Sequence, residues 1–383
     1  MRVPEQPPAR QAKVELEPTD RSGAELFRVL RSDGSADPAT DPKVGSKDLG
    51  SLYRLMLLNR ALDERMTTLQ RQGRIGFYIG SVGEEASILG SAFVMRPNDW
   101  IFPAYREHGA TLMRGMPLPR FLANLFGNEL DPIRGRQMPC HEAWEPGHVA
   151  SSSSPLATQL PHAVGVGWAA RLKGRDDVAL AYFGDGATST HDFHTGLNFA
   201  GVFKAQTIFL CRNNQWAISV PLSAQTASET LAIKARAYGL PGVRVDGNDL
   251  LAVIAVTRQA HERARSGQGA TLIEAVTYRV KGHSTSDDPR AYRKDDEVEP
   301  WLRRDPLVLL RQHLVHLGVL TGAEDETLRA QAEEEIRTAA AQVEKAGPPA
   351  LESLFEDVFA KIPWHLEEQR AEALSASRPT RLE

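Results

Sequence analysis

The chain has 383 residues, of which 42% are hydrophobic and 25% charged, as is typical of a globular protein in water. Its length allows one large α/β domain or two smaller ones. The net charge of −4 gives no indication of nucleic-acid binding, and no apolar run reaches the roughly 18 residues that a membrane-spanning helix needs.

The N-terminal region and the cysteines indicate the compartment. The first 20 residues contain several acidic residues and no apolar core, which argues against a signal peptide and against an acid-poor transit peptide. The chain has two cysteines, Cys140 and Cys211, and Cys211 falls in a segment that we expect to be a buried strand. We interpret both as reduced thiols and expect a cytoplasmic protein.

Three regions follow one another along the chain. Residues 1–46 are rich in Pro, Asp, Gly and Ser, so we expect a mobile N-terminal arm with one ordered piece near Leu26–Leu30. Residues 47–301 predict an α/β domain, and residues 302–383 predict a helical extension that packs on the domain or on a partner subunit. The expected elements, in chain order, are helices at 47–72 and 83–95, a strand at 100–104, helices at 118–126 and 156–173, strands at 178–183 and 207–211, a helix at 229–238, a strand at 243–245, a helix at 249–265 and a strand at 271–280. This alternation favours a doubly wound, mostly parallel sheet with helices on both faces.

Residues 182–219 carry the most specific pattern. The first strand ends in the turn Gly184-Asp185-Gly186, a helical pattern with Phe193 and Leu197 follows, and the next strand ends at Asn213-Asn214. This order predicts a βαβ unit whose two polar turns leave the carboxyl ends of parallel strands, where such sheets bind ligands.

The two turns favour a magnesium–diphosphate site. Asp185 offers a carboxylate oxygen and Asn214 an amide oxygen, and with a backbone carbonyl just past Asn214 and diphosphate oxygens they complete an octahedral Mg²⁺ site. Gly184 and Gly186 allow the backbone to approach the phosphates, and the following helix directs its N-terminus at them.

A second glycine motif has a different interpretation. Residues 165–170, GVGWAA, match a dinucleotide-binding fingerprint, with Asp185 at a suitable distance. That fingerprint requires a strand directly before it, whereas four serines and a proline precede this helix. We therefore interpret these glycines as contacts between a helix and the sheet.

The motifs SSPLATQLPHAVG, GDGA, CRNNQWAIS and HSTSDDPRAYR together resemble the α subunit of the branched-chain 2-oxo acid dehydrogenase E1 component, which uses thiamine diphosphate (ThDP). The resemblance runs from about Leu52 to Trp301. It implies a ThDP-binding fold and gives specific roles to residues. The implied metal ligands are Asp185, Asn214 and the Trp216 carbonyl; the implied cofactor-binding residues are Tyr105, Arg106, Ser154, Leu156, Asp185, Gly186, Ala187, Arg212, Asn214 and His283.

A serine-rich loop is implied to bind a monovalent cation such as K⁺. Its candidate ligands are Ser153, Pro155, Thr158 and Gln159. In the same resemblance Arg106 binds the diphosphate, Arg212 is a second phosphate ligand, and Leu156 is an apolar wedge under the bent cofactor.

His283 is the predicted catalytic residue. It opens a polar loop that leaves the carboxyl end of a strand, and a nearby diphosphate should raise its pKa. The resemblance places it beside the reacting substrate, where it helps to transfer the acyl group to lipoyl. Asp287 and Tyr292 are expected to order this loop, and Arg279 is expected to pair with an acid. In some relatives a serine at the Ser284 position is phosphorylated.

The resemblance implies a complete assembly as well as a reaction. We expect an inactive lone chain that needs an E1 β subunit, in an α₂β₂ heterotetramer, because the glutamate that activates the cofactor comes from β. The expected reaction is oxidative decarboxylation of branched-chain 2-oxo acids such as 3-methyl-2-oxobutanoate, with acyl transfer to a lipoylated E2 core. Phe77, Tyr78 and the loop from Gly76 to Gly80 that contains them are candidates for an apolar substrate wall.

Several alternatives remain at this point. The chain is also compatible with the same chemistry on pyruvate or acetoin, with a non-catalytic nucleotide-binding module, and with a degenerate scaffold subunit. For the helix with the seam Leu328, Ala332, Ile336, Ala339 and Val343, packing on its own domain and contact with another subunit are equally compatible with the pattern.

Overall fold

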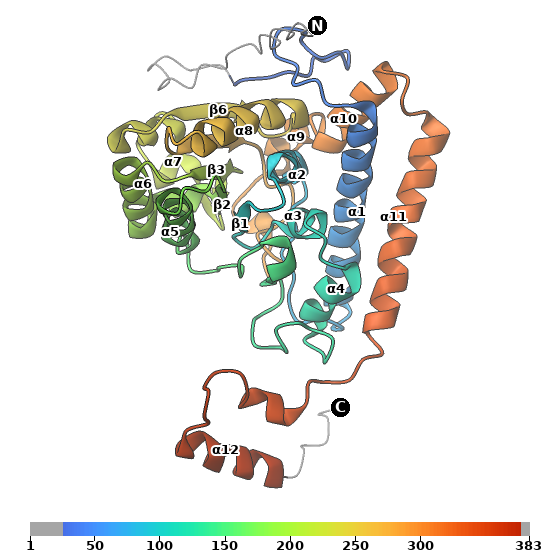
Figure 1. The fold of residues 1–383 in the computed structure, drawn as a ribbon. Helices are drawn as coiled ribbons and strands as arrows, with labels where there is room; N and C mark the ends of the chain where they lie inside the picture. Colours follow the sequence, from blue (N-terminus) through green and yellow to red (C-terminus); the bar gives the residue numbers. More distant parts are fainter. Residues whose placement is uncertain (1–25, 377–383) are drawn as a thin grey trace, which may run out of the picture.

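The computed structural model describes residues 26–376. Its centre is a five-stranded sheet of order β1-β2-β3-β7-β6 in which all neighbours are parallel (Figure 1). The strands are β1 (Trp100–Phe102), β2 (Ala179–Gly184), β3 (Thr207–Asn213), β7 (Thr271–Val276) and β6 (Gly242–Asp246). A short antiparallel pair, β4 (Trp216–Ala217) and β5 (Val220–Pro221), follows β3. The expected parallel sheet is confirmed.

The two faces of the sheet carry separate hydrophobic cores. Along β2, Leu180 and Tyr182 join one core whereas Ala181 and Phe183 join the other, as the two-residue period of a strand requires. Helices α5 (Gln159–Leu172) and α6 (His191–Phe203) cover one face, and α8 (Leu250–Arg265) with α2 (Glu85–Val94) covers the other (Figure 1). Helices therefore lie on both faces, as the sequence predicts.

The long C-terminal helix packs on the chain's own domain. It is α11 (Gly322–Val343), which runs beside α1 (Ser46–Arg71) and buries Ala332, Ile336 and Val343 (Figure 1). Of the two alternatives for its apolar seam, the intramolecular one is therefore the one observed. The remaining helices are α3 (His108–Met113), α4 (Leu118–Phe126), α7 (Leu222–Gln225), α9 (Glu299–Leu302), α10 (Pro306–His316) and α12 (Trp364–Ser375).

Three expected elements differ from the structure. The predicted helix at 229–238 is a 3₁₀ helix over Ala232–Tyr238, and side chains cap its first amides: Glu274 accepts from the Ala232 amide and Thr230 from the Ile233 amide. The helix expected from residue 156 begins at Gln159, after Ala157 adopts a left-handed φ of 69°. The strand expected over 271–280 ends at Val276, opposite Asn213, the last residue of β3.

The described part of the expected N-terminal arm is ordered. The Phe27 amide donates to the Arg244 carbonyl and the Asp246 amide to the Phe27 carbonyl, so this segment pairs with β6. The Asp249 carboxylate, which caps α8, also accepts from the amides of Val29 and Leu30 at 2.7 Å. The ordered piece expected near Leu26–Leu30 is confirmed, and residues 1–25 lie outside the described part.

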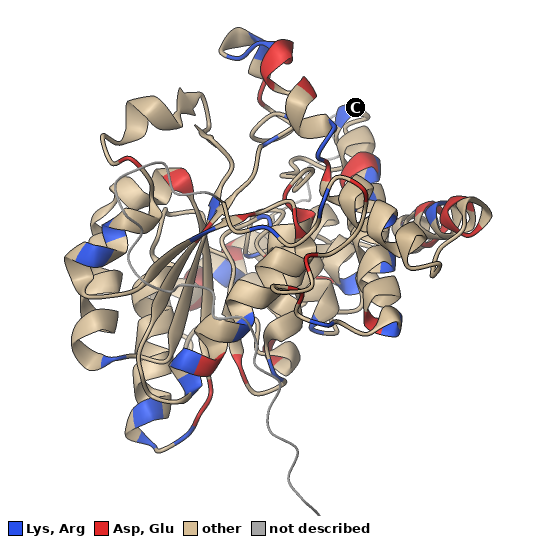
Figure 2. Cartoon of the chain, turned by 90° about the horizontal axis from the view of Figure 1, so that it is seen from above, with Lys and Arg blue, Asp and Glu red and all other residues tan. Residues whose placement is uncertain are grey.

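Charged residues lie mainly on the surface of the protein. Figure 2 shows charged residues of both signs interspersed over the outer helices and loops, whereas the strands carry few of them. Cys140 and Cys211 are both free and buried, which confirms their interpretation as thiols. Among residues 26–376, no helix combines the length and the apolar character needed to cross a membrane.

The glycine motif at 165–170 lies inside α5, as expected for a contact between a helix and the sheet. A Cβ atom on Gly167 would come within 2.7 Å of the Gln206 carbonyl oxygen and of the Thr207 side chain. On Gly165 it would meet no atom within 4 Å. Gly167 is therefore the residue that makes the close approach.

Candidate active site

A cavity of about 290 Å³ opens at the carboxyl ends of β2 and β3. Gly184 at the end of β2 is in register with Arg212 of β3, so the turns that follow the two strands are neighbours. The lining residues are Phe77, Ile79, Ala104, Tyr105, Arg106, Met138, Ser153, Ser154, Leu156, Ala157, Gln159, Phe183, Gly184, Asp185, Gly186, Ala187, Arg212, Asn214, Trp216, Ala217, Ile218 and His283. The structure thus brings together all the predicted site residues except Pro155 and Thr158, which are not among the lining residues.

Asp185 and Asn214 are buried at the two strand ends. The Asp185 Oδ2 atom accepts from Gln225 Nε2 at 2.6 Å. Burial raises the pKa of Asp185 to about 6, although the Gln225 hydrogen bond opposes the shift. The Asn214 Nδ2 atom donates to Glu84 Oε1 at 2.9 Å, and its Oδ1 atom accepts from the Trp216 amide at 3.3 Å.

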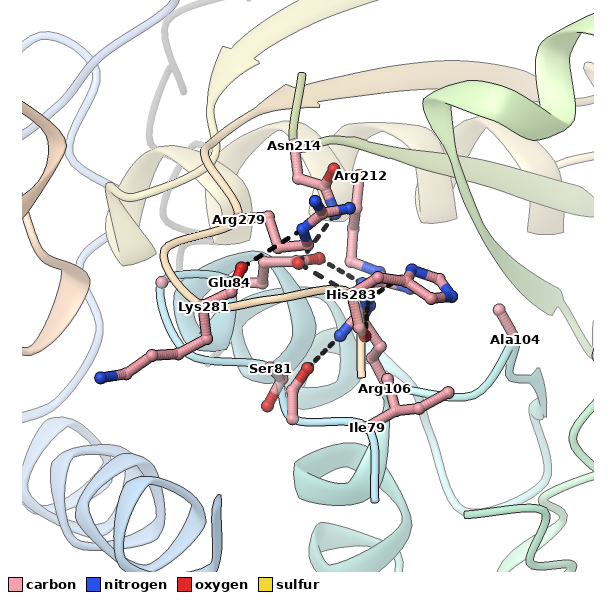
Figure 3. Close-up of polar contacts among 12 residues, drawn as sticks. Ile79, Ser81, Glu84, Ala104, Arg106, Arg212, Asn214, Arg279, Lys281 and His283 are labelled. Atoms are coloured by element: carbon pink, nitrogen blue, oxygen red, sulfur yellow. Dashed lines mark hydrogen bonds and ion pairs between the residues drawn. The ribbon is translucent and has the colours of Figure 1, made fainter. Parts of the chain in front are cut away.

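Two arginines occupy the floor of the cavity and have different partners (Figure 3). Arg106 donates to the Gly80 carbonyl and, at 2.8 Å, to the His283 carbonyl. Arg212 forms ion pairs with Glu84 and Glu107, both fully buried. The two glutamates balance the buried arginine charges, since an unpaired buried ion is very costly.

His283 faces Arg106 and Tyr105. Its Nδ1 atom lies 3.2 Å from Arg106 Nη2, and its ring meets the Tyr105 ring edge-on with centroids 6.0 Å apart. Burial, together with the charges of Arg106 and Arg279, lowers the pKa of His283 to about 4. The expected increase in pKa depended on a diphosphate; in the chain by itself the pKa is lowered.

The His283 loop is ordered by the two residues that the sequence singles out. The His283 amide donates to Asp287 Oδ2 at 2.6 Å, and the Tyr292 hydroxyl donates to the same oxygen at 2.5 Å. Arg279, however, does not pair with an acid as expected. Its guanidinium donates to the carbonyls of Trp216 (3.1 Å) and Ile218 (2.7 Å) and to the Tyr292 hydroxyl (2.6 Å), which joins this loop to the β4 segment.

The serine-rich loop gathers oxygens. The hydroxyls of Ser153 and Thr158 both donate to the Pro155 carbonyl, at 3.2 and 3.1 Å, and contact each other. The Gln159 Nε2 atom donates to the Tyr182 carbonyl at 2.6 Å. Its buried Oε1 atom accepts no hydrogen bond from the described residues, so one acceptor remains available beside the cavity.

Some residues of the site were not predicted. Glu84, Glu107 and Gln225 bind the predicted residues, and Met138 adds an apolar wall. Tyr78 does not line the cavity as proposed, because its hydroxyl donates to Asp63 in the interior at 2.6 Å. A signal for Glu84 exists in the sequence, since adjacent glutamates introduce a run of small and apolar residues and require buried partners.

The donor set fits a magnesium-bound diphosphate. Within residues 26–376 no three His, Cys, Asp or Glu side chains form a metal cluster, and the pair at the strand ends is instead one carboxylate and one amide, hard oxygens that suit Mg²⁺. At Gly184, which lines the cavity, an added Cβ would meet no protein atom within 4 Å. The backbone is therefore open to close approach by a ligand at this turn.

Comparison with known proteins identifies similar chains. A family model described as "Dehydrogenase E1 component" matches residues 53–352. The chain is 39% identical to the "2-oxoisovalerate dehydrogenase subunit alpha, mitochondrial" of Mus musculus over 93% of this chain and 81% of that protein. It is 40% identical to the "2-oxoisovalerate dehydrogenase subunit alpha" of Pseudomonas aeruginosa over 95% and 91%, and 42% identical to a subunit alpha 1 of the same description from Arabidopsis thaliana over 90% and 73%.

Proposed function

Because the chain belongs to the dehydrogenase E1 component family, we propose that it is the α subunit of a branched-chain 2-oxo acid dehydrogenase, a 3-methyl-2-oxobutanoate dehydrogenase that needs a β subunit. The resemblance noted in the sequence is confirmed by the family match and by relatives at about 40% identity. The observation that carries the proposal is the shared cavity into which the turns after β2 and β3 bring Asp185 and Asn214 together with Arg106 and His283.

The proposed cofactors are ThDP and Mg²⁺. Asp185, Asn214 and the Trp216 carbonyl would hold the metal. The Trp216 carbonyl accepts from Arg279 in the structure, and its second lone pair remains for a metal. Arg106 and Arg212 would bind the diphosphate, while Tyr105, Ser154, Leu156, Gly186 and Ala187 would contact the rest. When bound, ThDP supplies the electron sink that stabilises the charge left after CO₂ is lost.

His283 would control a proton beside the reacting carbon. A guanidinium only donates hydrogen bonds, so Arg106 leaves His283 Nδ1 as an acceptor and places the ring proton on Nε2. A diphosphate close to this ring would oppose the two arginine charges and raise its pKa. The residue could then donate a proton or hydrogen bond near neutral pH, as acyl transfer to lipoyl requires.

The serine-rich loop would bind a monovalent cation. Ser153, Pro155 and Thr158 already direct oxygens at one another. A cation would accept lone pairs from these oxygens and from the free Oε1 atom of Gln159, which would fix the loop that carries Ser154 and Leu156.

The proposed partners follow from the subunit name of the relatives and from the cavity. Relatives called subunit alpha imply a β subunit. Among the described residues that line the cavity, Asp185 is the one acid, which supports a glutamate supplied by β in an α₂β₂ heterotetramer. Acyl transfer would go to a lipoylated E2.

The eukaryotic relatives are named as mitochondrial and the bacterial one is not; the cytoplasmic location stays a prediction.

The proposed substrate is a branched-chain 2-oxo acid. Phe77, Ile79, Met138 and Leu156 give apolar walls that suit a branched aliphatic chain. The test is co-purification with the β polypeptide, followed by decarboxylation rates on 3-methyl-2-oxobutanoate and on pyruvate. We expect faster turnover of the branched acid. Faster turnover of pyruvate would assign the chain to a pyruvate dehydrogenase instead, and calorimetric binding of NAD without ThDP would favour a nucleotide-binding module.

A further inference from the structure

Glu84 is a buried carboxylate that the proposed chemistry leaves without a role. It lies at the start of α2 with 0% of its surface exposed. Its oxygens meet three residues from two segments of the chain: Oε1 accepts from Asn214 Nδ2 at 2.9 Å, Oε2 pairs with Arg212 of β3, and Arg106 Nε is 4.0 Å from Oε1 (Figure 3). Glu84 thus connects the arginine pair to the asparagine at the end of β3.

The two ends of an asparagine side chain have similar shapes and opposite hydrogen-bonding roles. A carboxylate can only accept, so the oxygen of Glu84 must face the NH₂ end of Asn214. The Trp216 amide, which can only donate, faces the oxygen end at 3.3 Å. A flipped amide would bring oxygen against oxygen at Glu84 and donor against donor at Trp216, and would lose both hydrogen bonds.

We propose that Glu84 is a positioning residue for the metal site, which fixes the Asn214 amide so that its oxygen is presented to the bound cation. The inference rests on the proposed function, since it assumes that Asn214 Oδ1 is a Mg²⁺ ligand. It assigns Glu84 no direct contact with metal, cofactor or substrate. Residues that orient a metal ligand in this way typically change metal affinity about 10- to 100-fold when substituted.

Glu107 provides a matched control within the same network. It is also buried and also pairs with Arg212. Its Oε2 atom accepts from the amides of Ala104 and Arg106 at 2.8 and 3.1 Å, and none of its hydrogen bonds involves Asn214. Neutralising Glu107 therefore disturbs the charge balance around Arg212 without changing the orientation of the asparagine.

The informative variant is Glu84→Gln in the complex with the β subunit. Arg212 is a charged donor and takes the glutamine oxygen, so the glutamine NH₂ group faces Asn214. The asparagine then turns its oxygen to this NH₂ group and its own NH₂ group to the cation. We expect the Mg²⁺ dissociation constant at saturating ThDP, followed by tryptophan fluorescence, to rise about 10- to 100-fold. Glu107→Gln removes the same charge but no hydrogen bond to Asn214, so it should raise the Mg²⁺ dissociation constant clearly less than Glu84→Gln.

A compensating change gives an independent test. Asn214→Asp presents oxygen at either end, so it accepts from the glutamine of Glu84→Gln and still offers an oxygen to Mg²⁺. In the unsubstituted background the same change opposes two carboxylates. We therefore expect the double variant Glu84→Gln/Asn214→Asp to bind Mg²⁺ more tightly than either single variant, a non-additivity expected of residues in contact.

The outcomes separate clearly. Unchanged Mg²⁺ affinity in Glu84→Gln, or an equal loss in Glu107→Gln, would overturn the proposal. A melting curve without cofactors shows whether Glu84→Gln folds. If it does not fold, the Mg²⁺ affinity of the double variant is compared with that of Asn214→Asp. Equal Mg²⁺ affinities of these two variants would then overturn the proposal. If the unsubstituted complex binds no ThDP–Mg²⁺, it is the proposed function that fails.

Discussion

Arg106 holds both the ring and the backbone of His283. Its Nη2 atom lies 3.2 Å from the Nδ1 atom of the imidazole and donates to the carbonyl oxygen of the same residue at 2.8 Å. One guanidinium thus fixes the position, the tautomer and, through its charge, the pKa of the histidine. Its other terminal nitrogen, Nη1, donates to the Gly80 carbonyl at the same time, and a side chain with a single nitrogen cannot reproduce this fork of contacts.

Arg106→Lys should therefore weaken ThDP binding. Loss of hydrogen bonds that involve a charged group costs about 1.5–3 kcal/mol, so we expect the ThDP dissociation constant in the α/β complex to rise roughly 10- to 100-fold by calorimetry. Arg114→Lys is the control, because Arg114 donates to backbone carbonyls away from the cavity. Equal ThDP affinity in Arg106→Lys and the unsubstituted complex would contradict the assignment.

The lowered pKa of His283 predicts how the stability of the protein changes with pH. Its folded pKa of about 4 lies below the ordinary value near 6.5, so the unfolded chain binds more protons between these two pH values. Above about pH 6.5 the histidine is neutral in both states and does not affect the free energy of unfolding. As the pH falls from about 6.5 toward 4, the unfolded chain takes up the proton first, so the free energy of unfolding decreases. His283→Gln should lose less melting temperature between pH 7 and pH 5 than the unsubstituted cofactor-free complex. Identical losses would refute the buried, neutral histidine.

ThDP–Mg²⁺ should move the same group in the opposite direction. A bound diphosphate places negative charge beside the ring, so the His283 resonance that titrates in NMR should shift to higher pH when the cofactor is added. The resonance is assigned by its absence in His283→Gln. A pKa unaffected by saturating cofactor would place the diphosphate elsewhere.

Asp185→Asn should separate stability from metal binding. Burial raises the pKa of Asp185 to about 6, so its ionised form is disfavoured in the folded chain, and this penalty grows as the pH rises from about 4 to 6. We expect the variant to melt at a higher temperature than the unsubstituted complex at pH 7.5 without cofactor. It should lose the further stabilisation by ThDP–Mg²⁺ that ligand linkage gives to the unsubstituted complex. A variant still stabilised by ThDP–Mg²⁺ would show that Asp185 is not a ligand.

The two glycines of α5 should respond differently to substitution. Gly167→Ala introduces a Cβ 2.7 Å from atoms of Gln206 and Thr207 at the start of β3, and overpacking of this kind costs about 1–3 kcal/mol. Gly165→Ala enters open space and should be neutral or stabilising by up to about 1 kcal/mol, because alanine favours helix. Denaturant unfolding of the two variants measures the difference, and similar values would argue against the helix–sheet contact.

Local patterns in the sequence predicted much of this site. The apolar runs and turns placed Asp185 and Asn214 at the ends of adjacent parallel strands, because strand, turn and helix signals all lie within about 35 consecutive residues. The cavity lining agrees with the cofactor residues named from the resemblance, from Tyr105 to His283.

What the sequence could not supply was the pairing of distant polar groups. Glu84 and Asn214 are 130 positions apart, and Arg279 reaches carbonyls of the β4 segment 61 and 63 positions away. No periodicity encodes such contacts, since they depend on how the sheet brings its loops together. The 3₁₀ form of Ala232–Tyr238 also differs from the prediction, and the acceptor of its first amide is Glu274 from β7, 42 positions away.

The pairing of Phe27 with β6 covers part of an edge of the sheet that could otherwise pair with another polypeptide chain. β6 is the outermost strand on that side, and its free amides and carbonyls would otherwise offer a template to any extended polypeptide. The chain places its own N-terminal segment along part of this edge, which limits strand-by-strand aggregation on the sheet that carries β2 and β3.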